Sequence, residues 1–152
     1  MVPPRAYLPK GVPNYVTQNG MDELKAEREK LVSEKADPEG VNENEKRISV
    51  NFINAKLRLL DERIARAVVV DLDQQGHDTV KFGATIKLKN TETGDTQTFQ
   101  IVGVDEANIS KGKISFISPV ARAFMNKKAG ERVRIQRPKE DVTYEILEIG
   151  YG

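Results

Sequence analysis

The sequence predicts an α+β fold in which an antiparallel α-helical coiled-coil hairpin is followed by a small antiparallel β-sheet domain with one short helix. Apolar residues recur at alternating steps of three and four over residues 50–67, which is the period of a coiled-coil seam. A polar segment with proline and glycine separates this stripe from a shorter one upstream. From residue 79 onward the apolar period changes to two, which is typical of strands.

The two stripes predict the two helices of the hairpin. The stripe of the second helix consists of Val50, Ile53, Leu57, Leu60, Ile64 and Ala67. The stripe of the first helix consists of Met21, Leu24, Arg28 and Leu31, with the arginine as its one polar break. We therefore expect the first helix to be shorter, with Thr17 and Asn19 as candidate N-caps.

Residues 33–47 form the candidate tip of the hairpin, because Pro38 and Gly40 disfavour one continuous helix there. Carboxylates outnumber cations in this segment. The candidate tip acids are Asp37, Glu39, Glu43 and Glu45. A solvated turn is one interpretation. The other is a rigid stalk that brings carboxylates to a divalent cation held by another molecule, because magnesium prefers oxygen ligands.

The chain divides into three segments. Residues 1–15 contain four prolines and predict an extended lead-in, or a strap lying on a partner. Residues 16–71 form the helical hairpin, and residues 72–152 form the second domain. In that domain we expect a turn at 93–95 and a short helix from Pro119 to about Lys127. The expected strands lie near residues 84–89, 96–102, 113–116, 132–135 and 143–149.

Composition narrows the function classes. Lys and Arg total 24 against 23 for Asp and Glu, so any contact with nucleic acid should be local rather than a general basic surface. The absence of cysteine excludes disulfides, thiolate metal sites and a cysteine nucleophile. No signal peptide or membrane-spanning run is visible, so we expect a cytoplasmic protein. The lone His77 lies in a polar loop with no nucleophile pattern nearby, which makes it a poor catalyst candidate.

Five ordered motifs resemble the Gre (GreA/GreB) family of bacterial transcript-cleavage factors. They are FGAT at 82–85, IVGVDEA at 101–107, KGKIS at 111–115, SPVARA at 118–123 and YEILEI at 144–149. Tyr15, Val16 and Thr17 with Gly20, Leu24 and Leu31 are similar to the start of the first helix in that family. The resemblance covers nearly everything after residue 15 and implies an FKBP-like second domain.

The resemblance also implies a function. A Gre factor docks its globular domain at the rim of the RNA polymerase secondary channel and places its hairpin inside. Tip carboxylates then help to hold the second Mg2+ of the polymerase active site, and the polymerase cuts the backtracked RNA 3' end. Such a factor is not itself an enzyme and needs no cofactor of its own. We expect its partners to be RNA polymerase and the nascent RNA 3' end. We also expect a monomer that makes no membrane contact, and contact with DNA is left open.

Two further sets of site residues follow from the resemblance. The docking set is Ser118, Pro119 and Arg122. From the residues alone, the serine and proline are also a helix N-cap and first turn. The candidate RNA-steering residues are Arg47, Lys56, Arg58, Arg63 and Arg66. Their alternative role is a solvated face with intrahelical ion pairs to Asp61 and Glu62.

The tip departs from the family pattern, which has an aspartate followed three positions later by a glutamate. One alignment matches Glu43 and Asn44 to the Glu-Asn of the family, and another carries the second helix back without a gap, but neither supplies both acids. The hairpin is also shorter than the usual Gre stalk by roughly fourteen residues, or about seven per arm, which shortens its reach by about 10 Å at about 1.5 Å per residue. One alternative is therefore a secondary-channel regulator that does not stimulate cleavage. Another is a peptidyl-prolyl isomerase, although the chain lacks Trp and its few aromatic residues are dispersed.

Overall fold

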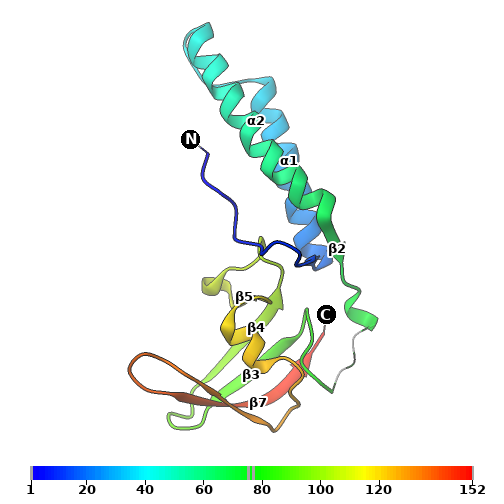
Figure 1. Cartoon of the computed structure of the whole chain (residues 1–152), viewed down its shortest axis with the longest axis vertical. Coiled ribbons are helices and arrows are strands. Elements are labelled where there is room, and N and C mark those ends of the chain that lie inside the picture. Colours follow the sequence, from blue (N-terminus) through cyan, green and yellow to red (C-terminus); the bar gives the residue numbers. More distant parts are fainter. Residues whose placement is uncertain (1, 75, 77, 152) are drawn as a thin grey trace. The chain divides into compact units, whose positions relative to one another are not determined.

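The computed structural model describes residues 2–74, 76 and 78–151, so that His77 lies outside the described residues. The chain forms two compact units, Met1–Val69 and Val70–Gly152, which we call the hairpin unit and the sheet unit. The sequence predicts this division after residue 71. The predicted α+β class is confirmed, since Figure 1 shows two long helices followed by a curled sheet with one short α-helix.

The helices of the hairpin unit are α1 (Gln18–Ala36) and α2 (Glu43–Arg66), which run antiparallel (Figure 1). The predicted N-cap Thr17 begins α1, because its Oγ1 accepts a hydrogen bond of 2.9 Å from the backbone N–H of Gly20. Asn19, the other candidate, lies inside α1. As expected, α1 is the shorter helix, and the connection between the two spans only residues 37–42.

The predicted stripes form the core of the hairpin unit. Its buried cluster consists of Val16, Leu24, Leu31, Ile53, Leu57 and Leu60, with Met21, Ile64 and Ala67 packed against it. Arg28, the polar break of the first stripe, reaches across to α2, where its Nε lies 2.7 Å from Asp61 Oδ1. The break therefore forms a partly exposed ion pair between the helices, and leaves the apolar seam intact.

Two short strands close the open end of the hairpin unit. β1 (Asn14–Val16) pairs in parallel with β2 (Ala67–Val69), with Tyr15 opposite Val68. The β-branched residues after α2 disfavour further helix, but the sequence does not predict this pairing. The pairing joins segments about fifty residues apart in the sequence, so local patterns carry little information on it.

Within its described residues, the sheet unit contains five strands, one short α-helix and two 3-10 turns. In order these are η1 (Leu72–Gln74), β3 (Thr85–Asn90), β4 (Thr96–Val102), η2 (Ile109–Lys111), β5 (Lys113–Ser115), α3 (Pro119–Phe124), β6 (Arg132–Ile135) and β7 (Val142–Gly150). The spatial order is β5-β4-β3-β7-β6. The prediction of a mostly antiparallel sheet is confirmed, since three of these pairings are antiparallel, while β4 and β5 are parallel.

The parallel pair has a local cause. After β4 the chain returns through residues 103–112, so β5 enters beside β4 in the same direction, with Ile114 opposite Ile101.

The short helix of the sheet unit ends earlier than predicted, since α3 ends at Phe124 and Asn126 has a φ of 67°. Ala121 and Phe124 are fully buried and anchor α3 in the unit. Within the described part of the chain, no helix is long and apolar enough to cross a membrane.

Candidate functional site: hairpin tip and sheet-unit groove

The hairpin tip is a tight turn closed by a reciprocal cap at the start of α2. Asn42 Oδ1 accepts a hydrogen bond of 2.9 Å from the backbone N–H of Glu45. In return, Glu45 Oε2 accepts one of 2.7 Å from the backbone N–H of Val41. Backbone donors at a helix start have no partner within the helix, so both bonds stabilise the turn. One of the four candidate tip acids is therefore engaged within its own turn.

Gly40 allows the close approach that this cap requires. Its φ is +139°, and a Cβ added there would lie 2.7 Å from Glu45 Cβ and 2.8 Å from the backbone nitrogen of Lys46. Ser49 Oγ donates a hydrogen bond of 2.8 Å to the backbone carbonyl of Glu39, which ties the loop to the first turns of α2. The tip is thus held by its own contacts.

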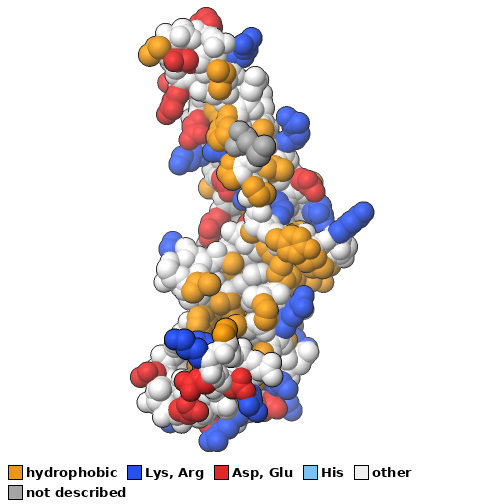
Figure 2. Space-filling view, turned by 60° about the vertical axis from the view of Figure 1, so that its left-hand side comes forward, with side chains coloured by type: hydrophobic (Ala, Val, Ile, Leu, Met, Phe, Trp, Pro, Cys, Tyr) orange, Lys and Arg blue, Asp and Glu red, His pale blue; other side chains and the backbone are white. Residues whose placement is uncertain are grey.

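The other three tip acids point to solvent. Asp37 is the C-cap of α1, Glu39 lies in the loop, and Glu43 is the first residue of α2. Within residues 2–74, none of the three carboxylates makes a hydrogen bond or ion pair, and no three acidic or histidine side chains group as metal ligands. Val41 protrudes beside them, with 91% of its surface exposed. Figure 2 shows acidic, basic and apolar side chains mixed around the tip, at the top of the view.

The candidate RNA-steering residues do not share one role. Arg47 donates a hydrogen bond of 2.8 Å to Asn44, and the Lys56 ammonium lies 4.7 Å from the centre of the Phe52 ring. Arg58 is exposed. The alternative of intrahelical ion pairs holds for Arg66, whose Nη1 lies 3.6 Å from Glu62 Oε1.

The lead-in, residues 1–15, contacts the helices of the hairpin unit through two of the candidate RNA-steering arginines. Arg63 donates to the backbone carbonyl of Ala6, and Arg66 donates to that of Val12 at 3.4 Å. Arg5 forms two hydrogen bonds to the Glu27 carboxylate, at 2.6 and 3.0 Å. The lead-in is therefore a strap bound to its own helices, and the side chains of Arg63 and Arg66 bind its backbone carbonyls.

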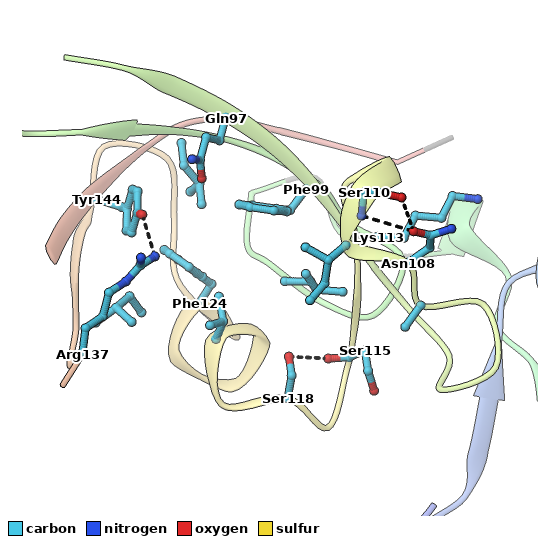
Figure 3. Close-up of a pocket in the computed structure, with 16 residues that line it drawn as sticks. Gln97, Phe99, Asn108, Ser110, Lys113, Ser115, Ser118, Phe124, Arg137 and Tyr144 are labelled. Carbon is cyan, nitrogen blue, oxygen red and sulfur yellow. Dashed lines mark hydrogen bonds between the residues drawn. The ribbon is translucent and has the colours of Figure 1, made fainter. Parts of the chain in front are cut away.

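The sheet unit contains a groove with a volume of about 740 Å³. Its apolar lining includes Leu88, Phe99, Ile109, Val120, Phe124 and Tyr144 (Figure 3). Ile109 belongs to η2 at the edge of the groove and has 82% of its surface exposed. Exposed apolar surface next to a concave apolar surface is typical of an interaction site.

The predicted docking residues are only partly brought together. Ser118 lines the groove and caps α3, accepting a hydrogen bond from the Ala121 N–H at 3.2 Å and donating one to the Ser115 carbonyl at 2.7 Å. Pro119 is exposed and lines a smaller hollow that shares Val120 with the groove. Arg122 is exposed and lines neither hollow.

Sequence reasoning missed most of the groove. It treated the aromatic residues as dispersed, whereas Phe99, Phe124 and Tyr144 converge on the groove from β4, α3 and β7 (Figure 3). It also did not single out Ile109 or Arg137. A large apolar residue between the polar neighbours Asn108 and Ser110 was the one available signal, because no amphipathic period explains it.

Comparisons with known proteins agree on one family. Residues 74–151, just over half of the chain, match the family model described as "Transcription elongation factor, GreA/GreB, C-term". The transcription elongation factor GreA of Hyphomonas neptunium is 40% identical over 101 residues, which is 66% of this chain and 64% of that protein. The GreA of Desulfovibrio desulfuricans is 40% identical over 97 residues, or 64% of this chain and 60% of that protein. The match thus spans less than two thirds of these relatives.

Two solved structures are also similar. GreA factor homolog 1 of Thermus thermophilus has a TM-score of 0.44 at 18% identity, covering 91% of this chain and 99% of that one. The GreA/GreB protein of Nitrosomonas europaea has a TM-score of 0.47 at 20% identity, covering 90% and 98%. The match to the family model is the observation that decides: this chain belongs to the GreA/GreB family of transcription elongation factors.

Proposed function

We propose that this protein acts on RNA polymerase during elongation, docking its sheet unit at the rim of the secondary channel and placing its hairpin inside. The observation that carries this proposal is the apolar groove, which lies within the part of the chain that matches the family model. Ser118, one of the three candidate docking residues, lies on the wall of this groove.

The groove has the properties of a protein-binding surface. Ile109 contributes a nearly fully exposed aliphatic side chain at its edge, and burying such a side chain stabilises a complex by about 1.5–3 kcal/mol. The near-zero net charge of the chain argues against a general attraction to nucleic acid. Binding therefore depends on the fit of a local surface.

Inside the channel, the hairpin acts as a regulator that occupies space without supplying metal ligands. Glu45 is engaged in the cap of α2, and the most exposed apolar side chain at the tip is Val41. The chain also lacks the family's aspartate and glutamate at their spacing. The 24 residues of α2 span about 36 Å, so the hairpin is long enough to enter a channel.

Stimulation of RNA cleavage is the second candidate, and it is favoured by the exposed carboxylates of Asp37, Glu39 and Glu43. Oxygen ligands of this kind bind Mg2+ at about 2.0–2.1 Å. The metal would belong to the polymerase active site, where a second cation stabilises charge and generates the nucleophile. In this case the chain would contribute only ligands and position.

One assay separates the two candidates. The protein is incubated with Mg2+ and polymerase complexes stalled in a backtracked state, and both its retention on the complex and the released RNA 3' fragment are followed. Retention without faster fragment release supports the channel regulator. Faster release that is lost in the Asp37→Ala, Glu39→Ala, Glu43→Ala triple variant, but kept in Glu29→Ala on the exposed side of α1, supports cleavage.

Docking is tested at the edge of the groove. Ile109→Ala removes exposed apolar surface and should weaken polymerase binding about 5- to 30-fold without loss of stability. Val68→Ala, an exposed aliphatic residue in the hairpin unit, is the control. Equal affinity of Ile109→Ala and the wild type would contradict docking through this groove.

A further inference from the structure

Arg137 lies at one end of the groove and is held in a fixed orientation. Its Nη2 donates a hydrogen bond of 3.1 Å to the Tyr144 hydroxyl, shown as a dashed line in Figure 3. Tyr144 is itself 7% exposed, and its ring packs edge-to-face on Phe124 with centroids 6.3 Å apart. The guanidinium is therefore anchored to the core of the sheet unit although Arg137 itself is exposed.

The groove has an uncompensated positive charge. Its 16 lining residues include Lys113 and Arg137 but no aspartate or glutamate. Lys113 is already paired, since its Nζ lies 3.2 Å from the buried carboxylate of Glu106. Among these lining residues, Arg137 is the cation without a carboxylate partner in the described structure.

The neighbouring hollow differs from the groove in that its cation is paired. It shares Val120 and Ile135 with the groove, and it too is lined by no acidic residue. Its own cation, Arg134, forms an ion pair with Asp141. The unpaired guanidinium of Arg137 is thus the feature of this surface that complements a negative charge.

We infer that the groove binds a protein segment carrying an apolar side chain beside a carboxylate, and that Arg137 is the residue that selects the carboxylate. Leu88, Phe99 and Phe124 line the space that receives the apolar side chain. One of the five N–H donors of Arg137 is engaged with Tyr144, which leaves enough for a two-point contact with a carboxylate. This inference rests on the proposed function for its assignment of the segment to RNA polymerase.

A protein segment fits this surface better than a nucleic acid does. Nucleic-acid binding depends on several phosphate contacts made by clustered lysines and arginines. Here the groove is predominantly apolar and offers one unpaired guanidinium. A protein interface combines the same elements, namely an apolar centre and an arginine that forms a directed contact.

The selection is tested with two peptides on the full chain. Both are acetylated and amidated nonamers of alternating residues, one of Leu and Glu and the other of Leu and Gln. Amide chemical shifts of the 15N-labelled protein are followed during each titration. We expect shifts at Phe99, Ile109 and Arg137, and a dissociation constant at least tenfold lower for the Glu peptide, because charge-assisted hydrogen bonds are stronger than neutral ones.

Variants of Arg137 assign the preference to this residue. Arg137→Gln should bind the two peptides equally. Arg137→Lys should keep a reduced preference for the Glu peptide, because lysine retains the positive charge but lacks the planar guanidinium that contacts a carboxylate at two points. Tyr144→Phe should also reduce the preference, since it frees the guanidinium. Equal binding of both peptides by the wild type, shifts outside the groove, or a preference that persists in Arg137→Gln would overturn the inference. Displacement of the Glu peptide by single-stranded oligo(dT) would overturn it as well.

The polymerase measurement separates this inference from the proposed function. We expect Arg137→Gln to weaken polymerase binding at least tenfold, comparably to Ile109→Ala. Unchanged binding by Arg137→Gln, together with weakened binding by Ile109→Ala, overturns the inference and leaves the proposed function standing. If the wild type does not bind polymerase at all, the proposed function fails, and the peptide preference alone decides what the groove selects.

Discussion

The Glu45 carboxylate accepts a hydrogen bond of 2.7 Å from the backbone N–H of Val41, so this tip acid holds the turn on which it lies. Asn42 completes the cap by accepting from the backbone N–H of Glu45. A carboxylate engaged in this way is directed at its own backbone, while Asp37, Glu39 and Glu43 face solvent. The tip acids therefore divide into one structural residue and three exposed ones.

Glu45→Ala should destabilise the hairpin unit by about 1 kcal/mol, because the substitution leaves the Val41 N–H without its partner. Glu43→Ala, two residues away and without such a bond, should change stability by less than about 0.5 kcal/mol. Urea unfolding followed by helical circular dichroism measures both. Equal effects of the two substitutions would show that Glu45 does not act as a cap.

Gly40→Ala should destabilise the tip more strongly than Gly94→Ala destabilises the β3–β4 turn. Both glycines have positive φ, but a Cβ at Gly40 would meet Glu45 and Lys46, whereas Gly94 has open space around it. We expect a loss of about 2–3 kcal/mol at Gly40 and about 1 kcal/mol at Gly94. Thermal unfolding of the two variants measures the two losses of stability. A loss at Gly94 as large as that at Gly40 would contradict the close packing of the tip.

The strap should depend more on Asn14 than on the ion pair between Arg5 and Glu27. Asn14 is fully buried, and its side chain donates a hydrogen bond of 3.0 Å to the Arg63 carbonyl. Asn14→Ala should cost about 1–3 kcal/mol, and Glu27→Gln at most about 1 kcal/mol because that ion pair is partly solvated. Amide hydrogen exchange of residues 5–12 should accelerate in both variants. Unchanged exchange in both would contradict the strap.

Tyr151 should make the sheet unit less stable at alkaline pH. Burial raises the pKa of its hydroxyl above the ordinary value of 10.0, and the negative charge of Asp78 adds to this, while the hydrogen bond from the Lys81 backbone opposes it. Because the pKa is higher in the folded state than in the unfolded state, the protonated hydroxyl of Tyr151 stabilises the fold. This contribution is fully present below pH 10.0 and is lost as the pH rises through the raised pKa. Tyr151→Phe should flatten the alkaline fall in unfolding free energy measured between pH 9 and 12.

The same variant should lower stability at neutral pH. The Tyr151 hydroxyl accepts from the Lys81 N–H at 2.8 Å and donates to the Thr79 carbonyl at 2.7 Å, so removing it leaves two backbone groups without this partner. We expect a loss of about 1–3 kcal/mol. An alkaline fall as steep in Tyr151→Phe as in the wild type would assign it to other groups.

Regular periodicity made much of the fold predictable. The three-and-four spacing of Ile53, Leu57 and Leu60 gave the helix that carries the buried seam, and the alternation around Ile86 gave β3. The cap was also readable, since Asn42 and Glu45 stand at the spacing of a capping box. In the sequence-based prediction, Glu45 is instead grouped with the other candidate tip acids.

Contacts between distant segments were not predictable. The parallel pairings of β1 with β2 and of β4 with β5 depend on how the chain returns, which no local period records. The contact between Arg137 and Tyr144 spans only seven residues, but it depends on the register of the β6–β7 hairpin, which must be known first. The groove was missed because its lining comes from separate strands, from η2 and from α3.

Photo-crosslinking from the hairpin tip tests most directly whether the hairpin enters the secondary channel. A benzoylphenylalanine in place of Val41, which is 91% exposed, is irradiated in the presence of stalled polymerase complexes, and the crosslinked polymerase peptides are identified. We expect crosslinks to polymerase segments that line the secondary channel, and a lower crosslinking yield with Ile109→Ala. Crosslinks confined to the outer surface of the polymerase, or none at all from a protein that binds it, would contradict the insertion of the hairpin.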